Sequence, residues 1–188
     1  MKKHFTLALL CCIPLNQVIA DDMEQRVEQS RAVVKEFGGA LKTELKKAIK
    51  EGGALQAITV CNTVAPAIAK HQSTKHGWDV GRTSLKPRNP DNAPDSWEKS
   101  VLEEFEARKQ AGESPAKMEY FAIVEQDGKK EFRYMKAIPV KKKPCLACHG
   151  TNIKAEIATA LDKLYLDDKA RGYKAGDIRG AFSITQPM

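Results

Sequence analysis

The segment Cys145-Leu146-Ala147-Cys148-His149 constrains this chain more than any other part of its sequence. C-x-x-C-H is the signature for attachment of a c-type haem. Two thiols at this spacing add across the vinyl groups of haem, and the adjacent histidine becomes the proximal iron ligand. We therefore predict one covalently bound haem c, with thioether bonds to Cys145 and Cys148 and with His149 on the iron. The chain must fold around this group.

Two other kinds of site use the same residue types. A redox dithiol of the thioredoxin type lies beside a βαβ unit, and no such unit is visible around the motif. A structural zinc site could combine Cys61, Cys145, Cys148 and a histidine. The sequence contains a single C-x-x-C pair, however. Haem is favoured over both alternatives.

Residues 1–20 have the features of a bacterial secretory signal. Lys2 and Lys3 are followed by a short apolar stretch, and small residues precede a cleavage site near Ala20/Asp21. We predict that residues 1–20 are removed and that residues 21–188 form one domain in the periplasm. An uncleaved anchor helix is the alternative. No apolar run reaches the roughly 18 residues that a membrane-spanning helix needs, so we expect no stable membrane insertion after cleavage.

Export changes what the positive charge means. The net charge of +7 falls to +5 when residues 1–20 are removed, because they contain two lysines and no acidic residue. Chromosomal nucleic acid is absent outside the cytoplasm, so we expect no nucleic-acid partner. The excess of lysine fits solubility or a docking face for an acidic partner. A content of 42% hydrophobic and 29% charged residues excludes a disordered or fibrous chain.

The pattern of apolar residues predicts an α+β fold. Apolar side chains recur at helical spacing in four stretches, which begin near residues 21, 54, 95 and 153. Gly52-Gly53 should end the first helix, and Pro66 should kink the second. Strands are predicted over residues 120–125, 131–140 and 178–185, the first two joined as a hairpin at Asp127-Gly128. Residues 77–94 are too rich in proline, glycine and asparagine for more than a short strand.

A single haem held by His149 leaves a second axial position on the iron. Cys61 lies on an apolar helix face, and Ala57 and Ala65 one turn away would let a flat macrocycle approach the backbone. Spacing alone leaves a distal ligand and an inert buried thiol equally open for Cys61. The other candidates are His71, His76, Met118, Met135 and Met188.

Four stretches of the sequence resemble one known family, at residues 58–69, 81–98, 137–150 and 176–184. It comprises exported mono-haem c-type proteins with a PAS-like fold, known from a cyanobacterial cytochrome and from bacterial haem-sensor modules. It is often described as a domain of unknown function. The resemblance implies His149 and Cys61 as the two iron ligands. It also implies a PAS-like antiparallel sheet with long N-terminal helices, over residues 21–188.

Two groups of basic residues lie near the predicted site. Arg82, Lys86 and Arg88 fall in the irregular segment and are candidate contacts for the haem propionates, which arginine and lysine commonly neutralise. The alternative for them is a solvated charged loop. The run 141–143 consists of three lysines and could steer an acidic redox partner to an exposed haem edge. The alternative for this run is an ordinary solvated surface.

These features predict a periplasmic mono-haem c-type cytochrome, which transfers single electrons or acts as a redox component. A haem with two protein ligands has no open position for a substrate, so we do not expect an enzyme. A haem-based redox or gas sensor that acts through a partner protein is the alternative, because PAS-like folds often sense. An enzyme of sulfur chemistry is disfavoured, since nothing supplies a second catalytic group.

Overall fold

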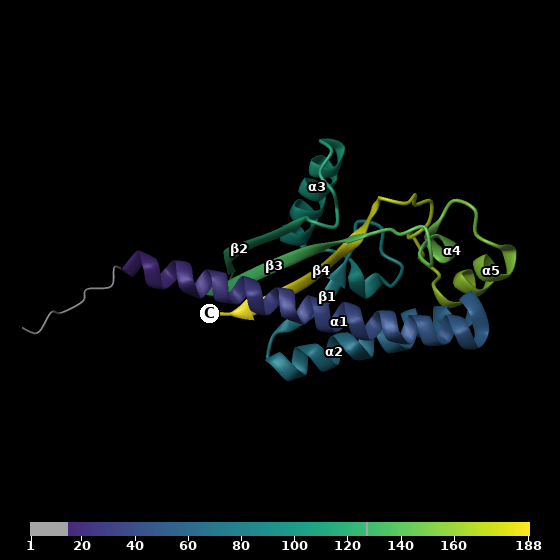
Figure 1. Cartoon of the computed structure of the whole chain (residues 1–188), viewed down its shortest axis with the longest axis horizontal. Coiled ribbons are helices and arrows are strands. Elements are labelled where there is room, and N and C mark those ends of the chain that lie inside the picture. The colour runs from purple at the N-terminus through teal and green to yellow at the C-terminus, as the bar shows by residue number, and fades with distance from the viewer. Residues whose placement is uncertain (1–14, 127) are drawn as a thin grey trace, which may run out of the picture.

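The computed structural model describes residues 15–126 and 128–188. Most of the predicted signal sequence, residues 1–14, lies outside the described residues. The described chain contains a four-stranded antiparallel sheet in the order β1-β4-β3-β2 (Figure 1). Its strands are β1 Asp79–Thr83, β2 Glu119–Gln126, β3 Lys129–Pro139 and β4 Ile178–Pro187. The helices are α1 Leu15–Thr59, α2 Ala65–His76, α3 Ser96–Gln110, α4 Leu146–His149 and α5 Ala155–Leu164.

Helices cover both faces of the sheet, as the alternation of its side chains requires. Phe132 and Tyr134 of β3 pack with Phe37 of α1 on one face. On the other face, Met135 of β3 packs with Phe105 of α3. Figure 1 shows α1 and α2 on one side of the sheet and α3 on the other. The predicted α+β fold with an antiparallel sheet and long N-terminal helices is confirmed.

The long N-terminal helix follows the sequence prediction in its interior and departs from it at the start. Gly52 and Gly53 leave helical geometry, so the chain turns there, and Ala54 begins the next helical segment. The helix starts at Leu15 rather than near residue 21, and it runs through the predicted cleavage site. The helical stretch Asp21–His76 contains an 18-residue segment whose mean hydropathy is high enough for a membrane-spanning helix. Core helices of soluble proteins and signal sequences also reach this length and hydropathy.

Helix α3 and the hairpin match their local sequence signals closely, whereas α5 does not. Asp95 caps α3 in a capping box: its side chain accepts a hydrogen bond from the Glu98 N–H, and the Glu98 side chain accepts one from the Asp95 N–H. The predicted hairpin is formed by β2 and β3. Helix α5 is shorter than the predicted range 153–167, because the chain leaves helical geometry at Tyr165 and turns back toward the C-x-x-C-H segment.

Candidate functional site

The predicted ligand residues come together at one cavity. Cys61, Cys145, Cys148 and His149 all line a cavity of about 220 Å³ beside the end of the sheet. An adjoining cavity of about 110 Å³ shares seven lining residues with it, including Cys61 and His149. The wall of the larger cavity is mostly apolar, with side chains from α1, β3 and α5: Leu41, Leu45, Ile49, Ile58, Ile138 and Leu161.

Cys61 reaches the cavity from a π-helical turn. Residues Val60–Val64 form this turn between α1 and α2, and the N–H of Ala65 donates to the carbonyl of Val60. Pro66 follows and has no N–H to give to the carbonyl of Asn62, so an ordinary α-helical bond is lost there. In place of the predicted kink the structure has this wider turn, and α2 begins at Ala65 with Pro66 in its first turn. Turns of this kind often occur at functional sites.

The C-x-x-C-H segment folds into the short helix α4. The N–H of His149 donates to the carbonyl of Cys145 at 2.9 Å, and the N–H of Gly150 donates to that of Leu146 at 3.1 Å. A Cβ at position 150 would lie 2.6 Å from the Leu146 oxygen, so glycine is required where the helix ends. Among the described residues Cys61, Cys145 and Cys148 are all free thiols. The helix therefore presents two thiols and an imidazole to one cavity.

The imidazole of His149 is held in the form that binds a metal. Its Nδ1 lies 2.8 Å from the carbonyl oxygen of Ala170. As the carbonyl can only accept, Nδ1 carries the proton and Nε2 keeps its lone pair. Burial, together with the charges of Arg179 and Arg88, lowers the pKa of His149 to about 3. The ring is therefore neutral at physiological pH, with Nε2 available as a ligand.

Burial and positive charge act in opposite directions on Cys61. Burial raises the pKa of its thiol, and the charges of Arg82, Arg88 and Arg179 offset only part of this effect. The free side chain is therefore a neutral thiol. A bound metal ion deprotonates a coordinating thiol outright, so the residue is suited to become a thiolate ligand when a metal is present.

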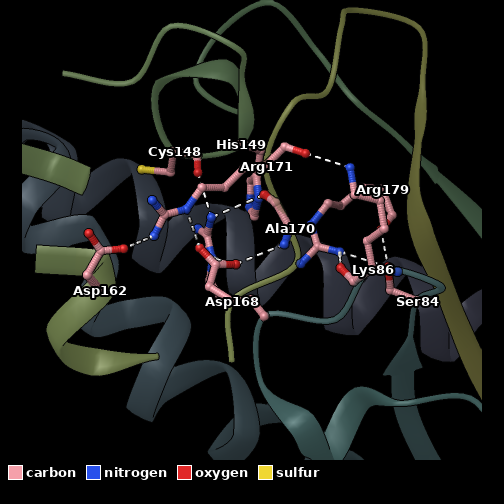
Figure 2. Close-up of polar contacts among 10 residues, drawn as sticks. Ser84, Lys86, Cys148, His149, Asp162, Asp168, Ala170, Arg171 and Arg179 are labelled. Atoms are coloured by element: carbon pink, nitrogen blue, oxygen red, sulfur yellow. Dashed lines mark hydrogen bonds and ion pairs between the residues drawn. The ribbon is translucent and has the colours of Figure 1, made fainter. Parts of the chain in front are cut away.

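A network of hydrogen bonds and ion pairs contacts the backbone of the C-x-x-C-H segment and the ring of His149 (Figure 2). Arg88 donates from Nε to Asp168 at 3.0 Å and from Nη2 to the carbonyl of Cys148 at 2.6 Å. Arg88 also donates to the carbonyl of Ala170, which is the acceptor for His149. Burial raises the pKa of Asp168, but hydrogen bonds from Arg88, Arg171 and the Ala170 N–H outweigh it and hold the pKa below its usual value. The network fixes the orientation of the imidazole.

Comparison with known proteins identifies the family. A family model described as Tll0287-like matches residues 16–187. The chain belongs to the Tll0287-like family. It is also similar to the crystal structure of the cyanobacterial heme-protein Tll0287, with a TM-score of 0.61 and 22% identity over 89% of this chain and 96% of that one. At this identity the likeness establishes a shared fold. A search of curated proteins found no match.

The three basic residues predicted near the site have different positions in this Tll0287-like structure. Arg82 and Arg88 line both cavities. Lys86 lines neither, because its Nζ donates to the carbonyl of Arg171 at 2.6 Å and lies 4.7 Å from the ring centre of Tyr173. Of the seven predicted site residues, the structure places six at the cavity and Lys86 outside it.

Sequence analysis missed Arg179, which also faces the Tll0287-like cavity. Arg179 lies on β4 next to Gly180 and donates to the Ser84 hydroxyl at 3.0 Å and to the Lys86 carbonyl at 3.2 Å. A Cβ at Gly180 would meet the Thr83 carbonyl oxygen at 2.2 Å, so this glycine lets β1 and β4 approach closely. A single charged residue inside the predicted strand 178–185 was the available signal. Asp168 and Tyr165 were missed because only folding brings them to the site.

Arg82 differs from the other two cavity arginines in its surroundings. Its guanidinium has no hydrogen bond to any residue that the structure describes, and it lies 5.7 Å from the ring centre of Phe37. Burial lowers the pKa of Arg82, since removal from water disfavours the charged form. A cation that is partly removed from water and has no anionic partner is unfavourable. Arg82 therefore offers a binding position for a negatively charged group of a ligand.

Proposed function

We propose that this chain binds one haem c covalently, through thioether bonds to Cys145 and Cys148, with His149 and Cys61 as the two axial ligands of the iron. One observation carries the proposal: these four residues, from two separate parts of the sequence, line the same apolar cavity. Membership of the Tll0287-like family supports it, as does the fold shared with a cyanobacterial heme-protein.

The residues of the cavity suit the three parts of a haem, which are the porphyrin, the iron and the propionates. Its apolar wall matches the porphyrin, and imidazole and thiolate are both established iron ligands. The propionates need cationic partners, and Arg82 and Arg179 line the cavities from the adjacent strands β1 and β4. We therefore extend the proposed propionate contacts to Arg179 and give Arg88 the role of positioning His149 and Cys148.

The function that this site supports best is one-electron transfer in the periplasm. Haem bound here would supply a ferric/ferrous couple, and Cys61 and His149 would both be ligands of the iron, which would leave no place for a substrate and supports a non-enzymatic role. The negative charge of a Cys61 thiolate favours the ferric state, so we propose a low reduction potential. Cleavage of residues 1–20 near Ala20/Asp21 belongs to the same proposal.

A redox partner with an acidic docking face completes the proposal. Lys141, Lys142 and Lys143 are exposed and directly precede the cavity residues Pro144 and Cys145. Positive charge at this position would accelerate encounter with an acidic protein and orient it toward the haem edge.

A haem-based redox or gas sensor that acts through a partner protein is the second candidate function. The position of Cys61 on a π-helical turn favours it. Such a turn is rare and frequently lies at a functional site, and a change from this turn to an ordinary α-helical turn would move Cys61. The distal ligand could thus be released while His149 stays fixed by Ala170.

Mass spectrometry and visible spectra of the protein exported to the periplasm test the haem proposal. We expect residues 21–188 plus the mass of one haem, and a low-spin thiolate spectrum. Cys61→Ser should abolish that spectrum and leave the haem attached, whereas the control His71→Asn should leave it unchanged. Bound zinc, or two free thiols in the C-x-x-C-H segment of the exported protein, would defeat the proposal.

A redox titration in the presence of CO or NO separates the two functions. A reversible low-potential couple without gas binding supports electron transfer. Gas binding with loss of the thiolate band supports the sensor.

A further inference from the structure

The aromatic ring of Tyr173 is a second contact of the His149 imidazole, beside the hydrogen bond to Ala170. The two ring centres are 6.2 Å apart, and the ring planes are inclined at 87°, which is an edge-to-face arrangement. Aromatic rings favour this arrangement over a face-to-face stack. Tyr173 is buried, at 7% exposure, and it lines neither of the two cavities that His149 lines. Its ring therefore contacts the imidazole from within the packed protein.

The backbone also ties Tyr173 to the C-x-x-C-H segment. The N–H of Tyr173 donates to the carbonyl of His149 at 2.9 Å, and the N–H of Gly172 donates to the carbonyl of Gly150 at 3.1 Å. Gly150 and Tyr173 thereby form a parallel β-bridge. The side chain of Tyr173 packs with Val140 in a small buried cluster. The position of Tyr173 is thus fixed relative to the histidine that its ring contacts.

Two cations hold the ring of Tyr173 in place. Nζ of Lys86 lies 4.7 Å from the ring centre, and Cζ of Arg179 lies 5.7 Å from it. The face of an aromatic ring attracts positive charge. Lys86 is held in turn by its hydrogen bond to the carbonyl of Arg171. Lys86, which the sequence suggested as a propionate contact, therefore supports the residue that packs against His149.

The hydrogen bond to Ala170 and the ring of Tyr173 restrict the imidazole in different ways. The bond from Nδ1 to the Ala170 carbonyl fixes one atom of the ring, but it permits the ring to turn about the direction of that bond. The edge-to-face contact with Tyr173 opposes this turn, because a rotated imidazole would lose the contact or overlap the fixed ring. The two contacts together define the plane of the imidazole.

We propose that Tyr173 is a positioning residue, which sets the plane of the His149 imidazole toward a haem held in the cavity. This inference rests on the proposed function, because it concerns the same histidine. The plane of an axial imidazole determines how its orbitals overlap with those of the iron, and hence how unpaired spin is distributed over a ferric haem. The aromatic ring of Tyr173 carries this role, and its hydroxyl group does not.

Proton NMR of the ferric, haem-loaded protein tests the proposal, because the shifts of the four haem methyl groups depend on the plane of the axial imidazole. Tyr173→Leu removes the ring and should change the order or spacing of these four signals. Tyr173→Phe keeps the ring and should give the parent pattern. Tyr120→Leu is the matched control, since Tyr120 pairs with Trp97 at 6.1 Å and lines neither cavity. This control should also give the parent pattern.

The outcomes separate this inference from the proposed function. The parent methyl pattern in haem-loaded Tyr173→Leu would overturn the inference alone, as would an equal change in Tyr173→Phe or Tyr120→Leu. A parent protein exported without haem would defeat the proposed function and the inference together. If Tyr173→Leu does not fold, nuclear Overhauser contacts in the diamagnetic ferrous parent decide the matter. They should connect the ring protons of Tyr173 and His149, and their absence would overturn the inference.

Discussion

Arg88, which is buried, and Arg82, which is half-buried, line the same cavity and illustrate how surroundings decide the role of a residue. Arg88 and Asp168 form an ion pair in which the side chains are 6% and 3% exposed. Arg88 also donates hydrogen bonds to the carbonyl groups of Cys148 and Ala170. Arg82 makes no hydrogen bond within the described chain and contacts Phe37. The first arginine stabilises the fold, whereas the second is available to a ligand.

Methionine substitutions should separate these two roles. Arg88→Met leaves the Asp168 charge buried without its partner, so the free energy of unfolding should fall by about 3–5 kcal/mol with or without haem. Arg82→Met should lower it only in the haem-loaded protein, where a propionate contact is lost. Urea unfolding of both forms of the chain measures the difference. Equal losses for the two variants in the haem-free chain would contradict this assignment.

A third single residue, Glu119, should make stability depend on pH. Hydrogen bonding with Arg31 lowers its pKa to about 2 against the opposing effect of burial, and the Tyr134 hydroxyl donates to it at 2.7 Å. The folded-state pKa lies below the usual value of 4.5, so the ionised form stabilises the fold above that pH. The stability advantage over Glu119→Gln should therefore shrink as pH falls from about 4.5 to about 2. A constant difference in urea unfolding across this range would refute the prediction.

At the scale of elements, the turn between the two parts of α1 brings Cys61 to the site. Gly53 adopts φ 67° and ψ −155°, a conformation that is essentially restricted to glycine. Gly39, in the same helix, has helical geometry and open space at its Cβ position. Gly53→Ala should destabilise the protein by about 1–3 kcal/mol, and Gly39→Ala should stabilise it by about 0.5–1 kcal/mol. Thermal unfolding of this matched pair checks both signs; stabilisation by Gly53→Ala would contradict the role of the turn.

At the scale of the whole molecule, lysines lie at both ends of the sheet. Lys141 and Lys142 precede α4, and Lys129 and Lys130 lie at the opposite, hairpin end (Figure 1). If the haem edge is exposed near α4, Lys141→Gln with Lys142→Gln should slow oxidation of the reduced protein by ferricyanide about twofold or more at low ionic strength. The difference should vanish in high salt because the charges are then screened. Lys129→Gln with Lys130→Gln is the control, and an equal effect there would contradict a local docking face.

Local signals in the sequence determined much of this structure by themselves. The break at Gly52-Gly53, the cap at Asp95, the hairpin and the C-x-x-C-H segment all depend on hydrogen bonds and torsion angles within a few residues, which a sequence pattern reports directly. The resemblance of four stretches to a known family likewise needed only the order of residues.

Tertiary structure alone decided which side chains meet at the site. Arg88 bonds with Asp168 across 80 residues of sequence, and Arg179 reaches the cavity because β4 pairs with β1. Lys86 lies two positions from Arg88 yet points to Arg171 instead of the cavity. These outcomes depend on strand register and on how the segment after α5 packs back against α4, and interactions between distant residues leave no periodic trace in a sequence. The direction of a side chain was therefore fixed by packing rather than by its neighbours along the chain.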